Sequence, residues 1–384
     1  MRSVAFLVLV AGCHHEQPDI VLPPDATIDA SPPPNIVTIE LFGETPTFLA
    51  YRDGDGPWQP VEQKSGVYQM HIHDKYELVG VCGDQTVGFD TAYEGSTFAE
   101  THGHTYVPCY SVSADGGTPV QVHGTMVQPG WVSIGYVDDK GTTSSWGFSL
   151  DVVPGMHDLI AIGNNRMTMR RDLQVAGAMT VPNVDVVGGG SAMPAVPYTV
   201  TGTQADETAS SGFYLLTQNE FVTLPREMGA GMHVPPPSLT VPGDYEIATF
   251  DATTQTSFRS ASTRYTGQPS LAFTLLPRLA GVQIGALDAS WTTLPPGTTV
   301  ELFMFGTTGA IHGTATPGWL GSATKLAFET DIPGFQASWV PSGSQGKQFD
   351  VTQLADGVRL TSGIQQDASV AKRVARLRRN IRLD

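Results

Sequence analysis

The sequence predicts an all-β protein made of about four tandem antiparallel β-sandwiches, and three observations support this fold class. The chain has 384 residues, which is too long for one ordinary hydrophobic core. It contains 42 glycines and 28 prolines but only 15% charged residues, a composition that favours strands and turns over helices. Apolar residues recur at every second position in short runs, as in strands with one buried face.

These alternating runs occur along the whole chain and are separated by turn sequences. Apolar residues occupy alternate positions in Val37–Leu41, Trp146–Val152 and Val300–Met304. Clusters rich in glycine and aspartate lie between such runs: Asp53–Gly56, Asp115–Gly117, Asp138–Gly141 and Gly188–Gly190. Because Asp-Gly is a common hairpin signal, we expect turns at these places, with a calcium-binding loop as the alternative for the first cluster.

A short motif repeats along the chain. Lys75–Val81, Met156–Ile162 and Asp244–Phe250 each contain an aromatic ring, an acid, an aliphatic residue and then small or apolar residues. Val-Pro-Gly precedes the second and third copies, and a weaker fourth copy begins at Ile332. The Pro-Gly pairs lie about 90 residues apart, a period that fits one sandwich of slightly under ~100 residues.

The motif places a turn glycine before a strand whose aromatic ring can lean back on the turn. This arrangement resembles the Gly-x-Tyr strand start of bacterial immunoglobulin-like and carboxypeptidase-regulatory-like domains, in which a tyrosine corner forms. His157 and Phe335 replace the tyrosine in two copies, so a tyrosine hydroxyl could not close those corners. From the period we expect sandwiches over 35–117, 118–200, 201–280 and 281–384, the last with a basic C-terminal end.

The first residues predict export. Arg2 precedes the apolar run Val4–Val10, and small residues stand before Cys13, which is the layout of a secretory signal. Val10–Cys13 resembles the lipobox of bacterial lipoproteins. The resemblance implies a signal peptide over 1–12, acylation of Cys13 and a lipid bilayer as partner, and His14 after the cysteine implies the outer membrane. A membrane helix is the alternative, but spanning a bilayer needs about 20 apolar residues.

Residues 13–34 predict a tether between this anchor and the first sandwich. The stretch contains six prolines and almost no periodicity. Proline-rich segments stay extended and cannot build a core. The segment would therefore hold the first sandwich away from the membrane.

Three cysteines are present, and two of them form a candidate disulfide. If Cys13 is acylated, Cys82 and Cys109 remain as a pair. An exported, oxidising compartment permits a disulfide between them. Two free buried thiols are the alternative.

The formal net charge of −16 makes nucleic acid an unsuitable partner. Residues 369–384 contain six Lys/Arg and one Asp, a net of +5, so the remaining residues carry −21. The basic end fits a helical spacing and also, in part, a strand; in an all-β chain we expect a strand, whose charges would protect a solvated sheet edge. A basic end could also contact an anionic lipid or polysaccharide surface.

His71 and His73 are candidate metal ligands. On a strand they would share one face, roughly 7 Å apart, opposite Tyr68, Met70 and Ile72. Zinc needs about four ligands, so further residues would have to contribute. A polar strand face without metal is the alternative.

Trp58 and Trp319 are candidate ligand-binding residues. Both lie beside proline in turn-like sequence, where an exposed ring could stack on a sugar. Tryptophans buried in sandwich cores are the alternative for all six in the chain, and we expect Trp131 and Trp146 to be core residues.

The sequence contains no Gly-x-Ser-x-Gly elbow, no His-Glu-x-x-His motif and no phosphate-binding loop. We therefore expect a non-enzymatic envelope lipoprotein without a cofactor, acting in binding, adhesion or as a scaffold, with polysaccharide or envelope proteins as partners. A carbohydrate-binding module and a metal-dependent hydrolase are the alternatives.

Overall fold

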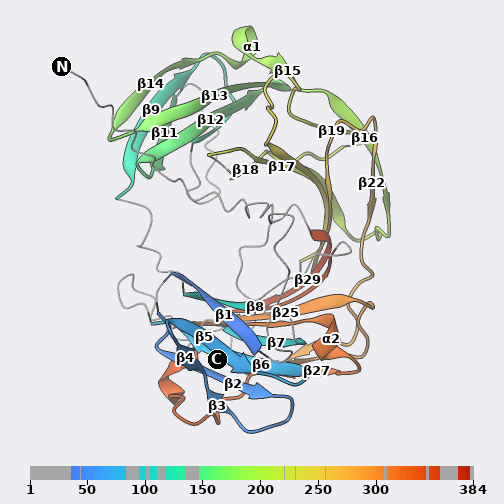
Figure 1. Ribbon diagram of the computed structural model, residues 1–384. Coiled ribbons are helices and arrows are strands. Elements are labelled where there is room, and N and C mark those ends of the chain that lie inside the picture. The colour runs from blue at the N-terminus through green and yellow to red at the C-terminus, as the bar shows by residue number, and fades with distance from the viewer. Residues whose placement is uncertain are drawn as a thin grey trace, which may run out of the picture.

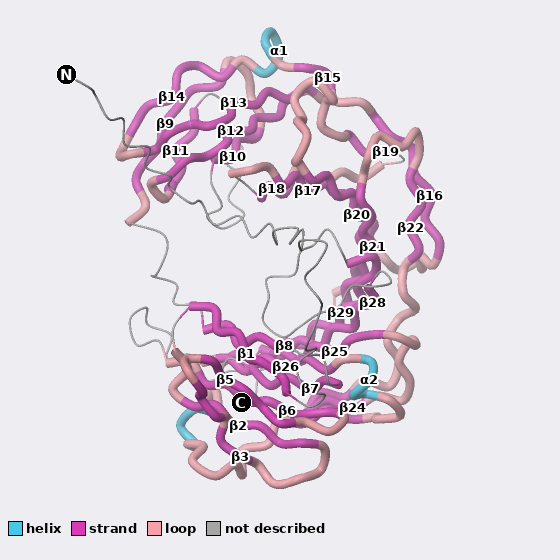
Figure 2. Tube along the Cα trace, in the orientation of Figure 1, coloured by secondary structure: helices cyan, strands magenta, loops and turns pink. Residues whose placement is uncertain are grey.

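The computed structural model describes residues 36–354 and 371–380, apart from 44, 84–94, 101–103, 110–117, 135–146, 220, 230, 256, 307–308 and 343–345. Nearly all of its regular structure is β-strand, which confirms the predicted all-β class (Figures 1 and 2). The helical segments within these ranges are short: α1 (Val186–Gly189), α2 (Pro317–Leu320) and the 3-10 helix η1 (Ala337–Trp339). The signal peptide, Cys13 and the tether lie outside the described residues.

The segment 36–109 contains two facing sheets. One has the strand order β4-β5-β1-β8, and the other consists of β7, β6, β2 and β3. The strands are β1 (Ile36–Gly43), β2 (Phe48–Asp53), β3 (Gln59–Pro60), β4 (Glu62–Lys64), β5 (Val67–His71), β6 (Lys75–Val81), β7 (Gly95–Glu100) and β8 (His104–Cys109). Val37 and Met70 from the first sheet and Tyr76 and Leu78 from the second belong to one buried cluster.

The segment 118–192 also contains two facing sheets, with the orders β10-β12-β13-β15 and β11-β9-β14. The strands are β9 (Val120–Met126), β10 (Trp131–Ile134), β11 (Gly147–Val152), β12 (Gly155–Gly163), β13 (Arg166–Val175), β14 (Met179–Val184) and β15 (Ser191–Ala192). Burial alternates along β11, where Phe148, Leu150 and Val152 point into the cluster that both sheets share. Trp131 packs at a cluster edge, and Trp146 lies outside the described residues.

The segment 195–276 pairs the sheet β19-β16-β22 with β18, β17, β20 and β21. The strands are β16 (Ala195–Thr201), β17 (Thr208–Leu216), β18 (Phe221–Thr223), β19 (Gly231–His233), β20 (Tyr245–Thr253), β21 (Ser257–Arg264) and β22 (Leu271–Thr274). Tyr198 and Phe273 from one sheet pack on Phe250 from the other, with ring centroids 5.6 and 6.0 Å from that of Phe250.

The last segment pairs the sheet β23-β24-β27 with β29, β28, β25 and β26. The strands are β23 (Gln283–Ile284), β24 (Asp288–Ser290), β25 (Thr298–Phe305), β26 (Ala310–Ala315), β27 (Lys325–Ala327), β28 (Gly346–Leu354) and β29 (Ala371–Asn380). Trp291 and Phe349 pack in the core of this segment, with ring centroids 5.5 Å apart.

Parallel strand pairs are a difference from the antiparallel sandwiches that the sequence predicts. In each of the first three segments the first strand has a parallel neighbour from late in the segment: β1 with β8, β9 with β14, and β16 with β22. Strands far apart in the chain need no hairpin between them, so chain connection does not impose an antiparallel direction. The alternation of apolar residues within one strand does not indicate whether its neighbour is parallel or antiparallel.

One sheet of twelve strands runs through three of the four segments. Its order is β18-β17-β20-β21-β29-β28-β25-β26-β7-β6-β2-β3. The parallel pair β26–β7 joins residues 313–315 to 96–98, so the end of the chain extends the sheet of its beginning. In Figure 1 this sheet curves along one side of the molecule.

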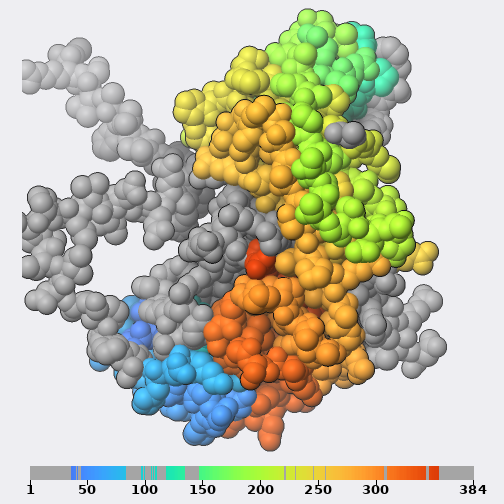
Figure 3. All heavy atoms as spheres, turned by 90° about the vertical axis from the view of Figure 1, so that its right-hand side faces the viewer, coloured from blue at the N-terminus to red at the C-terminus, as the bar shows by residue number. Residues whose placement is uncertain are grey.

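The buried side chains group these segments into two lobes. One cluster combines Ala50, Val79 and Val81 with residues 282–351, and we name residues 36–109 and 279–354 the terminal lobe. Another cluster combines Ile160, Met167 and residues 193–275, and we name residues 118–278 the middle lobe. Figure 3 shows the N-terminal strands in blue lying against the late strands in orange and red, with the middle of the chain at the other end. The boundaries predicted from the repeat stay a prediction.

The repeat motif falls on equivalent strands in three of its four copies. Lys75–Val81 is β6, the second copy lies within β12, and the third copy lies in β20 except for Asp244, which directly precedes the strand. The fourth copy differs, because Ile332–Phe335 forms a turn before η1 rather than a strand. Its aromatic residue falls one position early, which removes the spacing that the other copies share.

The basic C-terminal segment is a strand, as expected, but its predicted place at a sheet edge is wrong. β29 pairs with β21 on one side and with β28 on the other. It is therefore an interior strand of the twelve-stranded sheet. Two long partner strands supply backbone hydrogen bonds on both sides of β29, which an edge position could not do.

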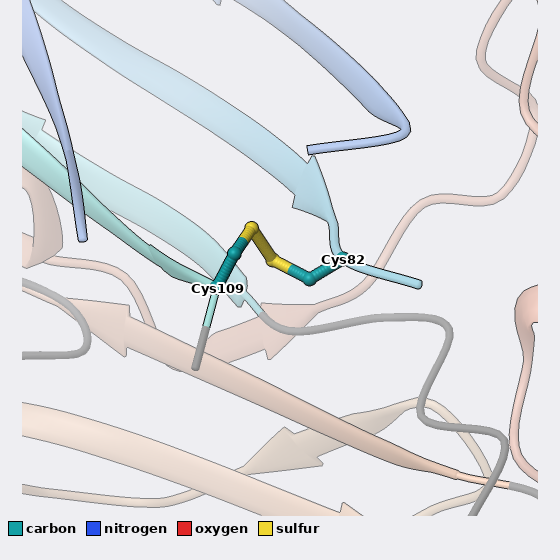
Figure 4. The surroundings of a disulfide bond; sticks show 2 residues. All are labelled: Cys82 and Cys109. Atoms are coloured by element: carbon teal, nitrogen blue, oxygen red, sulfur yellow. A yellow bond between two sulfur atoms is a disulfide. The ribbon is translucent and has the colours of Figure 1, made fainter. Parts of the chain in front are cut away.

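The candidate disulfide is present between Cys82, directly after β6, and Cys109, at the end of β8 (Figure 4). The two Cα atoms are 5.2 Å apart, and both residues are buried. The bond links the two facing sheets of the first segment.

Candidate functional sites

His71 and His73, the candidate metal ligands, lie at the end of β5 and just after it. Met70 and Ile72 are buried and both histidines are exposed, as the alternation predicts. The backbone N–H of His73 donates to Asp53 at 3.0 Å, and its ring Nδ1 is bonded to the same carboxylate. Among the described residues, no group of three or more His, Cys, Asp or Glu side chains is placed to hold a metal ion. A metal at the two histidines stays a prediction.

The Asp53–Gly56 cluster forms a turn between β2 and β3. The N–H of Gly56 donates to the carbonyl of Asp53 at 2.9 Å, and Gly54 has a φ of +54°. A left-handed backbone of this kind favours glycine. The hairpin expected for this sequence is therefore confirmed.

Trp58 and Trp319, the candidate ligand-binding residues, are both half-buried against the core of the terminal lobe. The indole N–H of Trp58 donates to Glu329 at 3.1 Å, and the Arg52 guanidinium lies 5.1 Å from its ring centroid. The Lys75 ammonium lies 5.9 Å from the ring centroid of Trp319. Both rings thus take part in packing between sandwiches, and sugar binding by them stays a prediction.

A charged cluster in the terminal lobe is built on the acid of the first repeat copy. Glu77 on β6 is directly opposite Arg52 on β2, and their side chains form an ion pair at 2.7 Å. Arg52 also bonds to Glu329 of the last segment at 2.9 and 3.0 Å. Burial raises the pKa of the Glu77 carboxyl, and the bond to Arg52 offsets this only in part. One guanidinium thus joins carboxylates from two sandwiches.

The middle lobe repeats this arrangement with the acid of the second copy. Asp158 on β12 is fully buried, and Arg171 on β13 lies 3.6 Å from it and 2.5 Å from Asp244 of the next segment. A β-bulge at Asp158 brings the backbone N–H of Asp172 within 3.0 Å of its carboxylate. Asn219 donates to Asp158 at 2.9 Å and to Asp172 at 3.0 Å. Three carboxylates are thus held by one arginine, one amide and one backbone N–H.

The acid of the third copy, Glu246, is held differently. Burial raises its pKa to about 7; a hydrogen bond from Thr240 opposes this shift, and the charge of Asp244 adds to it. The same position of the motif therefore carries a carboxylate paired with an arginine at Glu77 and Asp158, and at Glu246 a carboxyl that bonds to Thr240 and has a pKa raised to about 7.

The aromatic position of the motif also changes its chemistry between copies. In the second copy Nε2 of His157 lies 2.7 Å from the carbonyl oxygen of Val153, four residues back. The imidazole thus makes the type of bond that a tyrosine hydroxyl makes in a tyrosine corner. In the fourth copy Phe335 packs instead on Phe48 and Trp339, at centroid distances of 6.0 and 5.2 Å.

A polar network on β20 and β21 brings a serine close to a carboxylate. The hydroxyl of Ser260 donates to Asp251 at 2.6 Å and lies 3.0 Å from that of Thr249. All three residues are buried, and Arg226 forms an ion pair with Asp251. Since the carboxylate is already matched by a guanidinium, this network orients hydroxyls but does not resemble an activated nucleophile.

A second buried ion pair lies in the middle lobe, near its junction with the terminal lobe. Arg259 is 2% exposed and bonds to Glu207 and to the carbonyl of Leu276, with distances of 2.5 and 2.7 Å. Arg278 binds both Glu207 and Asp206. Burial would raise the pKa of Glu207, but the bond and charge of Arg259 outweigh it, and the pKa is lowered. These groups stabilise packing.

A cavity of about 250 Å³ lies beside Trp291 in the terminal lobe. It is formed by residues 291–298 together with 317 and 320–324, and none of these residues is charged. Thr292, Thr293, Ser322 and Thr324 are among the residues that line it. The indole N–H of Trp291 donates to the carbonyl of Ala323 at 3.0 Å, which fixes the ring at the cavity wall.

The arginines at the sandwich junctions are absent from the sequence prediction. Arg52 and Glu329 are 277 residues apart, and Arg171 and Asp244 are 73 apart. Only the repeated acid next to the aromatic residue was visible as a pattern, and its partners follow no periodicity. The acid position of the repeat is the signal that could have found these clusters.

No protein-family model matches this chain, and no curated protein matches it. Within the described residues, no helix has the length and apolar character needed to cross a bilayer.

Proposed function

We propose that this chain is an envelope lipoprotein, anchored through acylated Cys13, that acts as a non-enzymatic scaffold or binding protein. The main support for the scaffold role is that the described strands of different segments form one connected framework. Twelve strands from three segments form one sheet, and each lobe has a core shared by two sandwiches. A framework of this kind suits the holding of partners at set distances on an envelope surface.

The use of charged residues supports a non-enzymatic role. Arg52, Arg171 and Arg259 each bond to at least one buried carboxylate at an interface between segments or within a core. Catalytic groups instead converge on a site that a substrate can reach. The buried charges described here hold the framework together.

The anchor is tested by labelling cells with an alkyne analogue of palmitate. We expect the wild-type chain to be labelled and to fractionate with membranes, and Cys13→Ser to lose both properties. Cys82→Ser is the matched control, because it changes a cysteine outside the lipobox and should keep the label. A wild-type chain without label would contradict the lipoprotein proposal.

The location of the described domains, at the cell surface or in the periplasm, is tested by protease treatment of intact and lysed cells. Loss of the protein from intact cells would favour adhesion or polysaccharide binding at the surface. Protection until lysis would contradict adhesion and direct the search to periplasmic partners. Cys13→Ser in the periplasm serves as the protected control.

Carbohydrate binding is a second candidate, favoured by the uncharged cavity beside Trp291. Hydroxyl groups and an aromatic wall are the groups that bind a neutral sugar. We expect neutral oligosaccharides to change tryptophan fluorescence and to bind at least roughly tenfold more weakly to Thr292→Val with Thr324→Val. Thr180→Val with Thr199→Val, at exposed positions outside the cavity, is the matched control, and equal binding by both double variants would contradict this site.

A further inference from the structure

The interior position of β29 sets this strand apart from the others. Residues 373–377 pair with Ser257–Ala261 of β21, and residues 371–380 pair with Gly346–Leu354 of β28. β21 belongs to the middle lobe and β28 to the terminal lobe. We name the gap between these two facing strand edges the strand slot.

Among the described strands, β29 alone pairs with strands of both lobes. None of the four buried clusters contains side chains from both lobes. The filled strand slot is therefore the point at which backbone hydrogen bonds connect the two lobes. Without β29, the slot-facing edges of β21 and β28 would both lack a partner strand.

The connection before β29 is longer than its pairing requires. β28 and β29 are antiparallel neighbours, for which a loop of about two to five residues suffices. Residues 355–370 stand between them, and a chain of that length could span on the order of 55 Å. The number of residues in this connection therefore does not by itself hold β29 beside β28.

Charge distinguishes β29 from the rest of the molecule. The strand contains Lys372, Arg373, Arg376, Arg378 and Arg379 and no acid, whereas the chain outside 369–384 carries a net −21. The register places Arg376 opposite Asp350 of β28, a residue that is 3% exposed. The same register places Arg379 opposite Lys347, so the attraction comes from Asp350 and from the net negative charge of the rest of the chain rather than from acids along both neighbouring strands. Salt weakens attraction of this kind.

We propose that the strand slot is a binding site for an extended basic segment, and that the C-terminal strand of this chain is its exchangeable occupant. Binding follows β-augmentation, in which backbone hydrogen bonds supply affinity and alternate side chains supply specificity. Filling the slot joins the two lobes, and emptying it leaves two open edges. The proposal goes beyond the scaffold function and does not depend on the lipid anchor.

Exchange is tested with the full chain, carrying Cys13→Ala and a protease site inserted within 355–370. After cleavage we expect the C-terminal fragment to stay with the body at low salt. A labelled peptide of residues 369–384 should then replace it, at least roughly tenfold faster at ~0.5 M salt than at ~0.02 M. The peptide with Arg373→Glu, Arg376→Glu and Arg378→Glu should bind at least roughly tenfold more weakly.

Two results of this experiment would overturn the proposal. The fragment could separate from a folded body at low salt, which would mean that the slot has no affinity for it. The labelled peptide could fail to replace the fragment at any salt, which would mean that β29 is a permanent part of the sheet. Circular dichroism before and after cleavage shows whether the body stays folded.

A second pair of variants tests the register without cleaving the chain. Ser260 faces Val374 across the β21–β29 pair, so Ser260→Cys with Val374→Cys should form a disulfide in the Cys13→Ala background. Ser260→Cys with Ala375→Cys is one residue out of register and serves as the control. The matched disulfide should block peptide exchange. Equal cross-linking in both variants would overturn the strand slot.

Discussion

In both lobes a sandwich packs on another sandwich, and in both an arginine lies between two carboxylates at that contact. Arg171 binds Asp158 and Asp244, whose side chains are 0% and 3% exposed. Arg52 binds Glu77 and Glu329, whose side chains are 8% and 42% exposed. The terminal lobe also contains the Cys82–Cys109 disulfide.

The difference in burial means that the same arrangement of charges contributes unequally to the stability of the two lobes. A buried carboxylate that loses a cation partner cannot recover the loss from water, so the middle-lobe cluster is sensitive to single changes. An exposed carboxylate can be hydrated when its partner is removed. We therefore expect charge to dominate in the middle lobe and the disulfide in the terminal lobe.

The largest effect is expected for Arg171→Met. The change leaves Asp158 and Asp244 without their shared guanidinium, which should lower the free energy of unfolding by about 3–5 kcal/mol. Urea denaturation followed by circular dichroism measures the loss. Arg170→Met, on the neighbouring position of β13, is the control and should cost under ~1 kcal/mol. Equal losses in the two variants would remove the distinction between the lobes.

Removal of the disulfide should act on the terminal lobe. Cys82→Ser with Cys109→Ser opens a loop with a sequence separation of 27 residues, for which chain entropy gives about 3–4 kcal/mol. Trp58, Trp291, Trp319 and Trp339 belong to this lobe, so tryptophan fluorescence during denaturation reports on it. A reductant should reproduce the loss in the wild type and leave the double variant unchanged. Wild-type stability that is insensitive to reductant would contradict this expectation.

Glu246→Gln in the middle lobe should change how the stability of the protein depends on pH. The pKa of Glu246 is raised to about 7 in the folded chain, so the unfolded chain releases this proton first as pH rises. Stability is therefore lost between about pH 4.5 and 7. Glutamine removes this loss, and the variant should be more stable than wild type by about 2 kcal/mol at pH 8 and equal to it at pH 4. Thermal unfolding across pH measures the difference.

The control for the pH prediction is Glu62→Gln, on an exposed strand of the terminal lobe. It should shift the melting temperature by the same small amount at both pH values. A Glu246→Gln variant that behaves in the same way would show that burial at this position does not control the titration.

The smallest effect is expected for Arg52→Met. Glu329 is exposed, and the raised pKa of the buried Glu77 carboxyl makes it easier to protonate when Arg52 is removed, so the loss should be about 1–2 kcal/mol. The part that comes from Glu329 should shrink at high salt. Glu329→Gln alone and together with Arg52→Met completes a double-mutant cycle that isolates the pair. A loss as large as that of Arg171→Met would show that exposure does not distinguish the two clusters.

Local patterns predicted much of the strand structure. Alternation placed strands at β1, β11 and β25, and the repeat motif marked three core strands in three different segments. The pairing of Cys82 with Cys109 followed from the count of cysteines in a chain that the sequence predicts to be exported. The strands depend on residues close in sequence, and the disulfide depends on the strong tendency of cysteines to pair in an oxidising compartment.

The candidate sites were harder to predict for a physical reason. His71 and His73 show the expected exposure, but a metal site needs ligands from other strands, and sequence spacing does not reveal these. Trp58 and Trp319 lie in turn-like sequence and are nevertheless covered by packing from another sandwich. The exposure of a turn residue depends on which segment packs against it.

The sequence by itself determined the all-β class, the strand character of the repeats and the uneven distribution of charge, because period-2 alternation and residue type act locally. Only the tertiary structure decided that Arg52 meets Glu329, that the first strands pair in parallel with late strands of their segments, and that the basic end enters the middle of a sheet. Those outcomes are set by backbone hydrogen bonds and burial between residues far apart in the sequence, which local patterns do not report.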